Sequence, residues 1–250
     1  MRLGAGTDIY ETFEEGFDLF LGLLGPLMFI VLQATSFGTA MRIKEAKSTL
    51  QYSQVPFLAL FTNCVVWTVY GLCKVNFTVI VPNFAGIITS AYCIYVYETH
   101  STEYLPIRYY IASLFIIFIV LALGCMAATE SIGILGDGLS VLMMASPLSV
   151  ILIVLKEKST KALPFSTSCA SFGNCLTWTI YGLFVANDPI IYVPNFLGFI
   201  FSSYQMYLFS HYGLHIDNDG YEYASGLDEK VESSDSSPLL HGDDRNFRKY

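Results

Sequence analysis

Charge is scarce in this chain of 250 residues, and most of it lies in short clusters or near the two ends. Only 14% of the residues are charged and 54% are hydrophobic, whereas a soluble domain carries roughly a quarter charged residues. Between the charged clusters run apolar stretches of about 20 residues, long enough to cross the hydrocarbon core of a bilayer. We therefore predict an integral membrane protein surrounded by lipid. The net charge of −8 comes mostly from acidic tails and does not indicate nucleic-acid binding.

The patterns that hold a metal or build a catalytic site are also missing. The cysteines show no Cys-x-x-Cys pair and no Cys/His spacing that suits a metal, so we interpret them as small buried hydrophobic residues. The sequence shows no plausible Ser/His/Asp arrangement either. We therefore expect neither an enzyme nor a cofactor or metal. The cysteines are Cys64, Cys73, Cys93, Cys125, Cys169 and Cys175.

Carboxylates are nearly absent from the predicted spans. Asp137 and Asp188 are the exceptions, and we expect both at or near the outer ends of their spans. Carriers that are coupled to protons or sodium place carboxylates or histidines inside the membrane. The solute is therefore expected to be uncharged and to move down its gradient.

Seven apolar segments are long enough to be transmembrane helices, and the Lys and Arg residues orient them. Basic clusters follow the first and the fifth segment, whereas the loops on the opposite face contribute only Lys74. Positive loops stay in the cytosol, so residues 1–18 are predicted to be outside and the polar, disordered tail 213–250 to be cytosolic. The segments are 19–41, 55–73, 76–97, 107–128, 132–155, 162–185 and 189–212.

What the chain does contain is an internal repeat. Val81-Pro82-Asn83-Phe84 recurs 112 residues later as Val193-Pro194-Asn195-Phe196, and the block around Trp67 recurs 111 residues later around Trp178. Such self-similarity indicates a duplicated unit. We predict an all-α membrane protein with seven transmembrane helices, arranged as two parallel three-helix repeats (19–97 and 132–212) joined by a linker helix (98–131).

Asn83 and Asn195 are candidate binding residues. A proline before each removes a backbone hydrogen bond from the helix, and the amide supplies donors and an acceptor. One buried Asn would usually hold helices together. Two in equivalent places are better explained as a pair that grips a neutral, polyhydroxylated solute from both sides.

Trp67 and Trp178 each lie four residues after an asparagine, Asn63 or Asn174, so each pair shares a helix face. A flat apolar ring beside an amide suits a sugar, whose C–H face stacks on indole while its hydroxyls bond the amide. Packing is the alternative role. At the outer side, a contact between Asp188 and the hydroxyl of Tyr70 would close the mouth, although a solvated loop position for Asp188 is equally compatible with the sequence.

Together these motifs resemble the SWEET (MtN3/saliva) family of sugar facilitators. The second unit carries most of the resemblance, which covers about residues 18–212 and excludes the tails. The matching residues are Ala145-Ser146-Pro147-Leu148-Ser149, Lys158-Ser159-Thr160, Leu163-Pro164-Phe165, Trp178, Tyr181-Gly182, Asp188, Val193 to Phe199 and Gln205-Met206. The first unit matches less closely, through Arg42-Ile43, Lys47-Ser48-Thr49, Pro56-Phe57, Trp67, Tyr70-Gly71 and Asn83.

The resemblance implies passive, bidirectional passage of mono- or disaccharides, often by a homo-oligomer. It implies a central pocket lined by the asparagines and tryptophans named above, with an outer gate formed by Tyr70 and Asp188. It also implies four hinge prolines near the cytosolic side. Three are present, Pro56, Pro147 and Pro164, and Ser36 stands at the fourth place.

Two other functions compete with this interpretation. A fold-related PQ-loop exporter of an amino acid or other small solute would need a carboxylate inside the membrane for proton coupling. A seven-helix receptor has no need of two parallel units with matched Pro-Asn pairs. In the tail, Asp235 to Leu240 fits an acidic dileucine pattern that sorting adaptors read. We expect the plasma membrane, with endolysosomal and Golgi membranes as alternatives.

Overall fold

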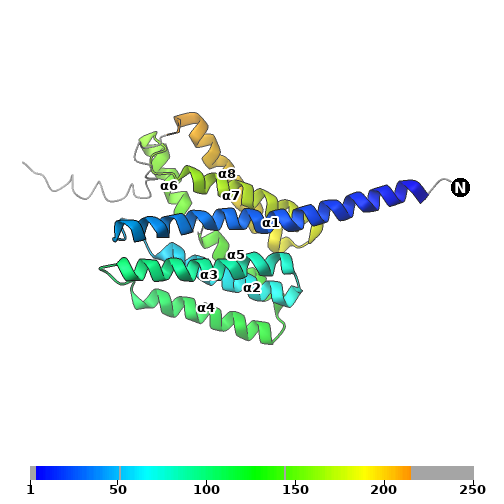
Figure 1. Cartoon of the computed structure of the whole chain (residues 1–250), viewed down its shortest axis with the longest axis horizontal. Helices are drawn as coiled ribbons and strands as arrows, with labels where there is room; N and C mark the ends of the chain where they lie inside the picture. Colours follow the sequence, from blue (N-terminus) through cyan, green and yellow to red (C-terminus); the bar gives the residue numbers. More distant parts are fainter. Residues whose placement is uncertain (1–3, 51, 144, 215–250) are drawn as a thin grey trace, which may run out of the picture.

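The computed structural model describes residues 4–50, 52–143 and 145–214, which are helical apart from short connections. The helices lie beside one another in a bundle (Figure 1), and the described ranges contain no strand. The helices are α1 (Gly4–Ala46), α2 (Val55–Lys74), α3 (Phe77–His100), α4 (Ile107–Cys125), α5 (Thr129–Met143), α6 (Ala145–Glu157), α7 (Phe165–Ile180) and α8 (Pro189–Tyr212), with a π-helical turn η1 (Tyr181–Val185) after α7.

A helix occupies each predicted span. Helices α5 and α6 together fill the fifth span, and α7 with η1 fills the sixth. Helix α1 begins at Gly4 rather than near residue 19, and its N-terminal part projects beyond the bundle in Figure 1.

By length and composition, the described residues hold five helices that could cross a membrane: 15–46, 55–74, 77–100, 107–125 and 129–157. The sixth and seventh spans fall outside that set. Helix α7 has only 16 residues before η1 interrupts it, and α8 carries many tyrosine, serine and amide side chains that lower its hydropathy.

The backbone repeats as the sequence does. Lys47 and Lys158, which are 111 positions apart, both have a φ of 52°, and Val75 and Asn187, which are 112 positions apart, have φ values of 52° and 47°. A positive φ is uncommon for residues other than glycine, so its recurrence at equivalent positions shows that the two units turn their corners in the same way.

The π-helical turn explains why the repeat offset changes. The offset is 111 up to Tyr181-Gly182 and 112 from Val193 onward, so the second unit has one extra residue between them. Helix η1 covers Tyr181–Val185, within that interval. A π-helical turn accommodates an extra residue in a helix without ending it, and the residues beyond it therefore keep their register with the first unit.

The two units pack through each other's first and second helices. Helix α1 contacts α7, and α5 contacts α2, while the hairpins α2–α3 and α7–α8 close each unit. Helix α4 packs mainly against α2 and α5 and lies at the edge of the bundle (Figure 1). Its outward side chains are large and apolar, as expected of a lipid-facing helix: Leu114, Phe115, Phe118 and Leu121. Helices from both units therefore border the space between them.

The expected hinge prolines lie at or near helix starts. Pro56 is in the first turn of α2, and Pro164 is the residue before α7. Pro147 lies near the start of α6, but its side chain is outside the described residues. Ser36 lies within α1, which continues through it without interruption.

Candidate binding site and outer gate

A cavity of about 180 Å³ lies between the two units, and all six predicted binding residues line it. None of the described residues that line the cavity is charged. The remaining lining residues come mainly from α1, α5 and the Pro-Asn segments. The full set is Phe29, Leu32, Leu60, Asn63, Trp67, Val79, Asn83, Ser140, Met143, Asn174, Trp178, Ile191, Pro194 and Asn195.

The two Pro-Asn asparagines make the same bond in both units. The Asn83 Nδ2 donates to the carbonyl of Val79 (2.9 Å), and the Asn195 Nδ2 donates to the carbonyl of Ile191 (2.7 Å). Each bond fixes the amide next to the proline, where the helix continues but lacks one backbone hydrogen bond. An amide has a second N–H and an acceptor oxygen, so each side chain is held in place and still has groups to offer a hydroxyl.

Each tryptophan lies against a glycine from the first helix of the other unit. A Cβ added to Gly136 would lie 3.3 Å from the ring of Trp67, and one added to Gly25 would lie 3.4 Å from the ring of Trp178. The absence of a side chain at these glycines lets α5 and α1 approach the indoles closely. Both tryptophans therefore lie at the boundary between the units.

The hydrogen bonds of the two tryptophan–asparagine pairs differ. In the first pair, Ser140 Oγ donates to Asn63 Oδ1 (3.3 Å) and accepts from Trp67 Nε1 (3.3 Å). In the second pair, Asn174 Oδ1 and Trp178 Nε1 are buried and have no partner among the described residues. Sequence analysis did not single out Ser140, because no motif marks it and its role depends on the rotation of α5.

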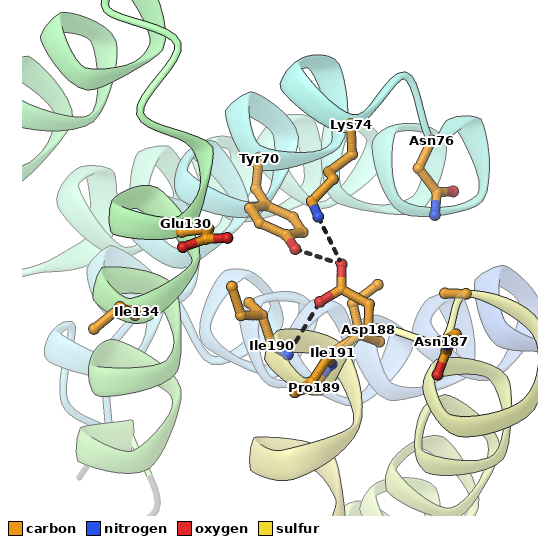
Figure 2. Close-up of a pocket in the computed structure, with 11 residues that line it drawn as sticks. Tyr70, Lys74, Asn76, Glu130, Ile134, Asn187, Asp188, Pro189, Ile190 and Ile191 are labelled. Carbon is orange, nitrogen blue, oxygen red and sulfur yellow. Dashed lines mark hydrogen bonds and ion pairs between the residues drawn. The ribbon is translucent and has the colours of Figure 1, made fainter.

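The predicted gate residues are in direct contact above this cavity. The Tyr70 hydroxyl donates to Asp188 Oδ2 at 2.5 Å, and Lys74 Nζ lies 3.5 Å from the same oxygen (Figure 2). The other oxygen, Oδ1, accepts from the backbone N–H of Ile190 and caps α8 (3.1 Å). Asp188 is 9% exposed, so its contact with Tyr70 is a shielded, charge-assisted hydrogen bond, which is stronger than a neutral one. Sequence analysis did not include Lys74 in the gate.

A second contact across the units mirrors the first. The Asn76 Nδ2 donates to the Tyr181 hydroxyl (3.1 Å), and that hydroxyl lies 3.3 Å from Asn76 Oδ1. Asn76 caps α3 as Asp188 caps α8. Tyr181 and Asp188 follow Tyr70 and Asn76 at the repeat offsets of 111 and 112, so the offset held the signal for this contact although the sequence analysis did not use it. We call the two contacts the aspartate latch (Tyr70–Asp188) and the asparagine latch (Asn76–Tyr181).

An outer cavity of about 470 Å³ adjoins the latches (Figure 2). Glu130, Asn187 and Ile190 line it together with the residues of the aspartate latch. Ile191 lines both this cavity and the central one. The two cavities are therefore separated at this end of the bundle, which the sequence predicts to face outside.

Asp137 lies in the first part of the fifth span. It is within α5, which begins at Thr129, and its side chain is half-buried. Its Oδ1 atom is buried and has no partner among the described residues. The fifth span therefore carries a partly buried carboxylate.

Comparison with known proteins gives the family. A family model described as "Sugar efflux transporter for intercellular exchange" (MtN3_slv) matches residues 19–103 and again residues 130–215. The chain belongs to the SWEET family. The two matched segments fall on the two repeat units, so the predicted family is confirmed. This family is one of sugar transporters and not of enzymes, as expected.

Plant SWEET proteins are similar to this chain over most of its length. The bidirectional sugar transporter SWEET7 of Arabidopsis thaliana is 36% identical over 205 residues, which cover 77% of this chain and 79% of the relative. SWEET1b of Oryza sativa subsp. indica is 32% identical over 203 residues, which cover 76% and 77%. A solved eukaryotic SWEET transporter superposes with a TM-score of 0.67 at 24% identity, over 80% of this chain and 98% of that chain. This likeness confirms the predicted fold class.

Proposed function

We propose that this SWEET chain is a bidirectional, energy-independent facilitator that carries mono- or disaccharides across a membrane by alternating access. The observation that carries the proposal is the uncharged central cavity, with an asparagine and a tryptophan from each unit facing each other beneath a closed outer gate. Relatives that carry the name of bidirectional sugar transporters support it. The tryptophans give the sugar ring apolar contact surface, and the amides of Asn83 and Asn195 bond its hydroxyls.

Transport then follows from movement of one unit against the other. Both latches join the units at the outer end, so they break when the units rock apart there and the cavity opens outward. The hinges of this motion are Pro56, Pro147 and Pro164, with Ser36 at the fourth place. Because a sugar is neutral, the empty carrier and the loaded carrier have the same net charge, which suits passive exchange.

The surroundings of the carrier are also part of the proposal. We place the N-terminus outside and the C-terminus in the cytosol, in a plasma membrane, with the chain forming a homo-oligomer. The sorting pattern at Asp235 to Leu240 lies outside the described residues and stays a prediction from the sequence.

The decisive experiment is counterflow of labelled glucose, fructose and sucrose in proteoliposomes, with and without a pH gradient. Wild type is compared with Asn83→Ala and Asn195→Ala. We expect flux that is independent of the gradient and is reduced at least about tenfold in both variants, because each loses a hydrogen-bonding group at the site. Absence of flux with every sugar, in protein that remains monodisperse, would refute the proposal.

The partly buried Asp137 favours one competing function, a proton-coupled exporter. Carboxylates within membrane spans often mark proton pathways. The same assay separates the two functions. Flux that follows the pH gradient in wild type and loses that dependence in Asp137→Asn would establish coupling, whereas gradient-independent flux in both proteins would leave the facilitator.

A further inference from the structure

The two walls of the central cavity offer different hydrogen-bonding groups. On the first wall, Ser140 satisfies both Asn63 and Trp67. On the second wall, the oxygen of Asn174 and the indole N–H of Trp178 have no partner among the described residues. Asn174 is 6% exposed and Trp178 is 5% exposed, so these polar atoms are buried with their bonds unmade.

The sequence explains why the second wall is unsatisfied. The position equivalent to Ser140 in the first unit, 111 residues earlier, is Phe29, which also lines the cavity. A phenyl ring has no group that can bond an amide or an indole. One side-chain difference between α1 and α5 therefore leaves a donor and an acceptor free on one wall only.

Buried polar groups without partners are costly, and the cost is removed by a ligand that supplies the partners. Asn174 and Trp178 are four residues apart and so share one face of α7. Both residues line the cavity, and together they hold an unpaired acceptor and an unpaired donor beside it, which a hydroxyl group, or two neighbouring hydroxyls, can satisfy. The first wall has no such demand.

We propose that the sugar binds asymmetrically: Asn174 and Trp178 make direct hydrogen bonds to its hydroxyls, while Ser140 holds Asn63 and Trp67 as a wall that contributes contact surface. Ser140 is then a positioning residue that decides which unit reads the hydroxyls. This inference rests on the proposed function, since it places a sugar in the central cavity.

The repeat provides a matched pair of variants for the test. Trp178→Phe and Trp67→Phe make the same change at equivalent positions and keep an aromatic ring. The probe is whichever of labelled glucose, fructose and sucrose wild type carries fastest in counterflow. We expect Trp178→Phe to raise KM about tenfold, because a buried donor that bonds the sugar is lost, and Trp67→Phe to raise it about twofold.

Ser140 provides the second arm. In Ser140→Ala, Trp67 Nε1 and Asn63 Oδ1 lose their protein partner and become available to the sugar. These freed groups can replace the bond that Trp178→Phe removes, so adding Trp178→Phe to Ser140→Ala should raise KM only about threefold. Adding it to Ser140→Thr, which keeps the hydroxyl, should again raise KM about tenfold. A merely structural role for Ser140 would lower Vmax or yield without changing the effect of Trp178→Phe on KM.

The outcomes separate the inference from the function on which it rests. Equal KM values for Trp178→Phe and Trp67→Phe, or a larger effect at Trp67, would overturn the asymmetric site and leave the facilitator intact. An effect of Trp178→Phe on KM that Ser140→Ala leaves unchanged would overturn the role of Ser140. A wild-type protein that carries none of the three sugars would overturn both the proposed function and this inference. Each variant is first checked for a wild-type elution profile in detergent.

Discussion

Tyr70 and Tyr181 occupy equivalent residues of the two units but bond to partners of different charge. Tyr70 donates to the carboxylate of Asp188 at 2.5 Å, and Tyr181 bonds to the neutral amide of Asn76 at 3.1 Å. Hydrogen bonds to charged groups contribute about 1.5–3 kcal/mol, against about 0.5–1.5 kcal/mol for neutral ones. Lys74 adds little to the aspartate latch because its side chain is 43% exposed. The aspartate latch should therefore be the stronger of the two.

Removing one hydroxyl at a time tests this order. Tyr70→Phe should increase the population of the outward-open state about tenfold or more, and Tyr181→Phe should increase it about threefold. A factor of ten in this population corresponds to about 1.4 kcal/mol. A cysteine introduced at Ile191, which is buried between the two cavities, reports opening through its labelling rate with an impermeant maleimide. The parent without this cysteine gives the background from the natural cysteines. Equal labelling rates in both Phe variants would contradict the ranking.

At the scale of elements, the hairpins of the two units depend on a glycine at the same place. A Cβ added to Gly71 would lie 2.9 Å from the Ile80 side chain, and one added to Gly182 would lie 2.8 Å from the backbone nitrogen of Tyr192. A side chain can move away, whereas the backbone of a packed helix cannot do so without strain. The second hairpin should therefore tolerate a methyl group less well.

We expect Gly182→Ala to lower thermal stability in detergent by the equivalent of about 1–3 kcal/mol, and Gly71→Ala by less. Gly138→Ala is the matched control, because nothing lies within 4 Å of a Cβ at this helical glycine. There the substitution should be neutral or stabilising, since alanine favours a helix by about 1 kcal/mol over glycine. The measurement is the midpoint of heat-induced loss of the monodisperse peak. A midpoint for Gly182→Ala at or above that of wild type would refute the steric argument.

The elements also show what the sequence could and could not predict. Pairs such as Asn83 and Asn195 were predictable because the duplication presents each signal twice, and a doubled polar residue in an apolar segment is hard to explain by packing. The contacts of Ser140 and the burial of Asp137 were not predictable, because both depend on how α5 is rotated against its neighbours. In the sequence, the π-helical turn appears only as the change of the repeat offset from 111 to 112. That change shows that one residue was added but does not show which conformation it adopts.

At the scale of the whole molecule, the linker helix α4 is attached to the first unit. Thr62 on α2 and Ser113 on α4 are buried and lie 2.6 Å apart between their hydroxyl oxygens. Near the start of α2, the Gln54 Nε2 donates to Glu98 (2.7 Å) and to the Tyr110 hydroxyl (2.8 Å), and this hydroxyl also donates to Glu98. We therefore expect α4 to move with α2 and α3 during transport.

Cross-linking separates contacts within a moving body from contacts between bodies. A disulfide between Thr62→Cys and Ser113→Cys should leave counterflow near the uncross-linked level, because these residues keep their distance throughout the cycle. A direct disulfide cannot replace the aspartate latch, because the length of the tyrosine ring separates the two backbones by more than a disulfide spans. A reducible bis-methanethiosulfonate cross-link between Tyr70→Cys and Asp188→Cys should instead abolish counterflow until a reductant is added, because it holds the two units together at this end. Flux is measured before and after oxidation or cross-linking, and single-cysteine variants serve as controls. Loss of flux on oxidation of the first pair would place α4 with the other unit.

Asp188 caps α8 with one carboxylate oxygen and holds Tyr70 with the other. Opening the outer end therefore leaves the first turn of α8 intact, and no secondary structure has to be rebuilt when the gate closes again. The side chains of the gate separate while the helices that carry them stay folded. The speed of each cycle is therefore limited by breaking a few side-chain contacts and not by local refolding.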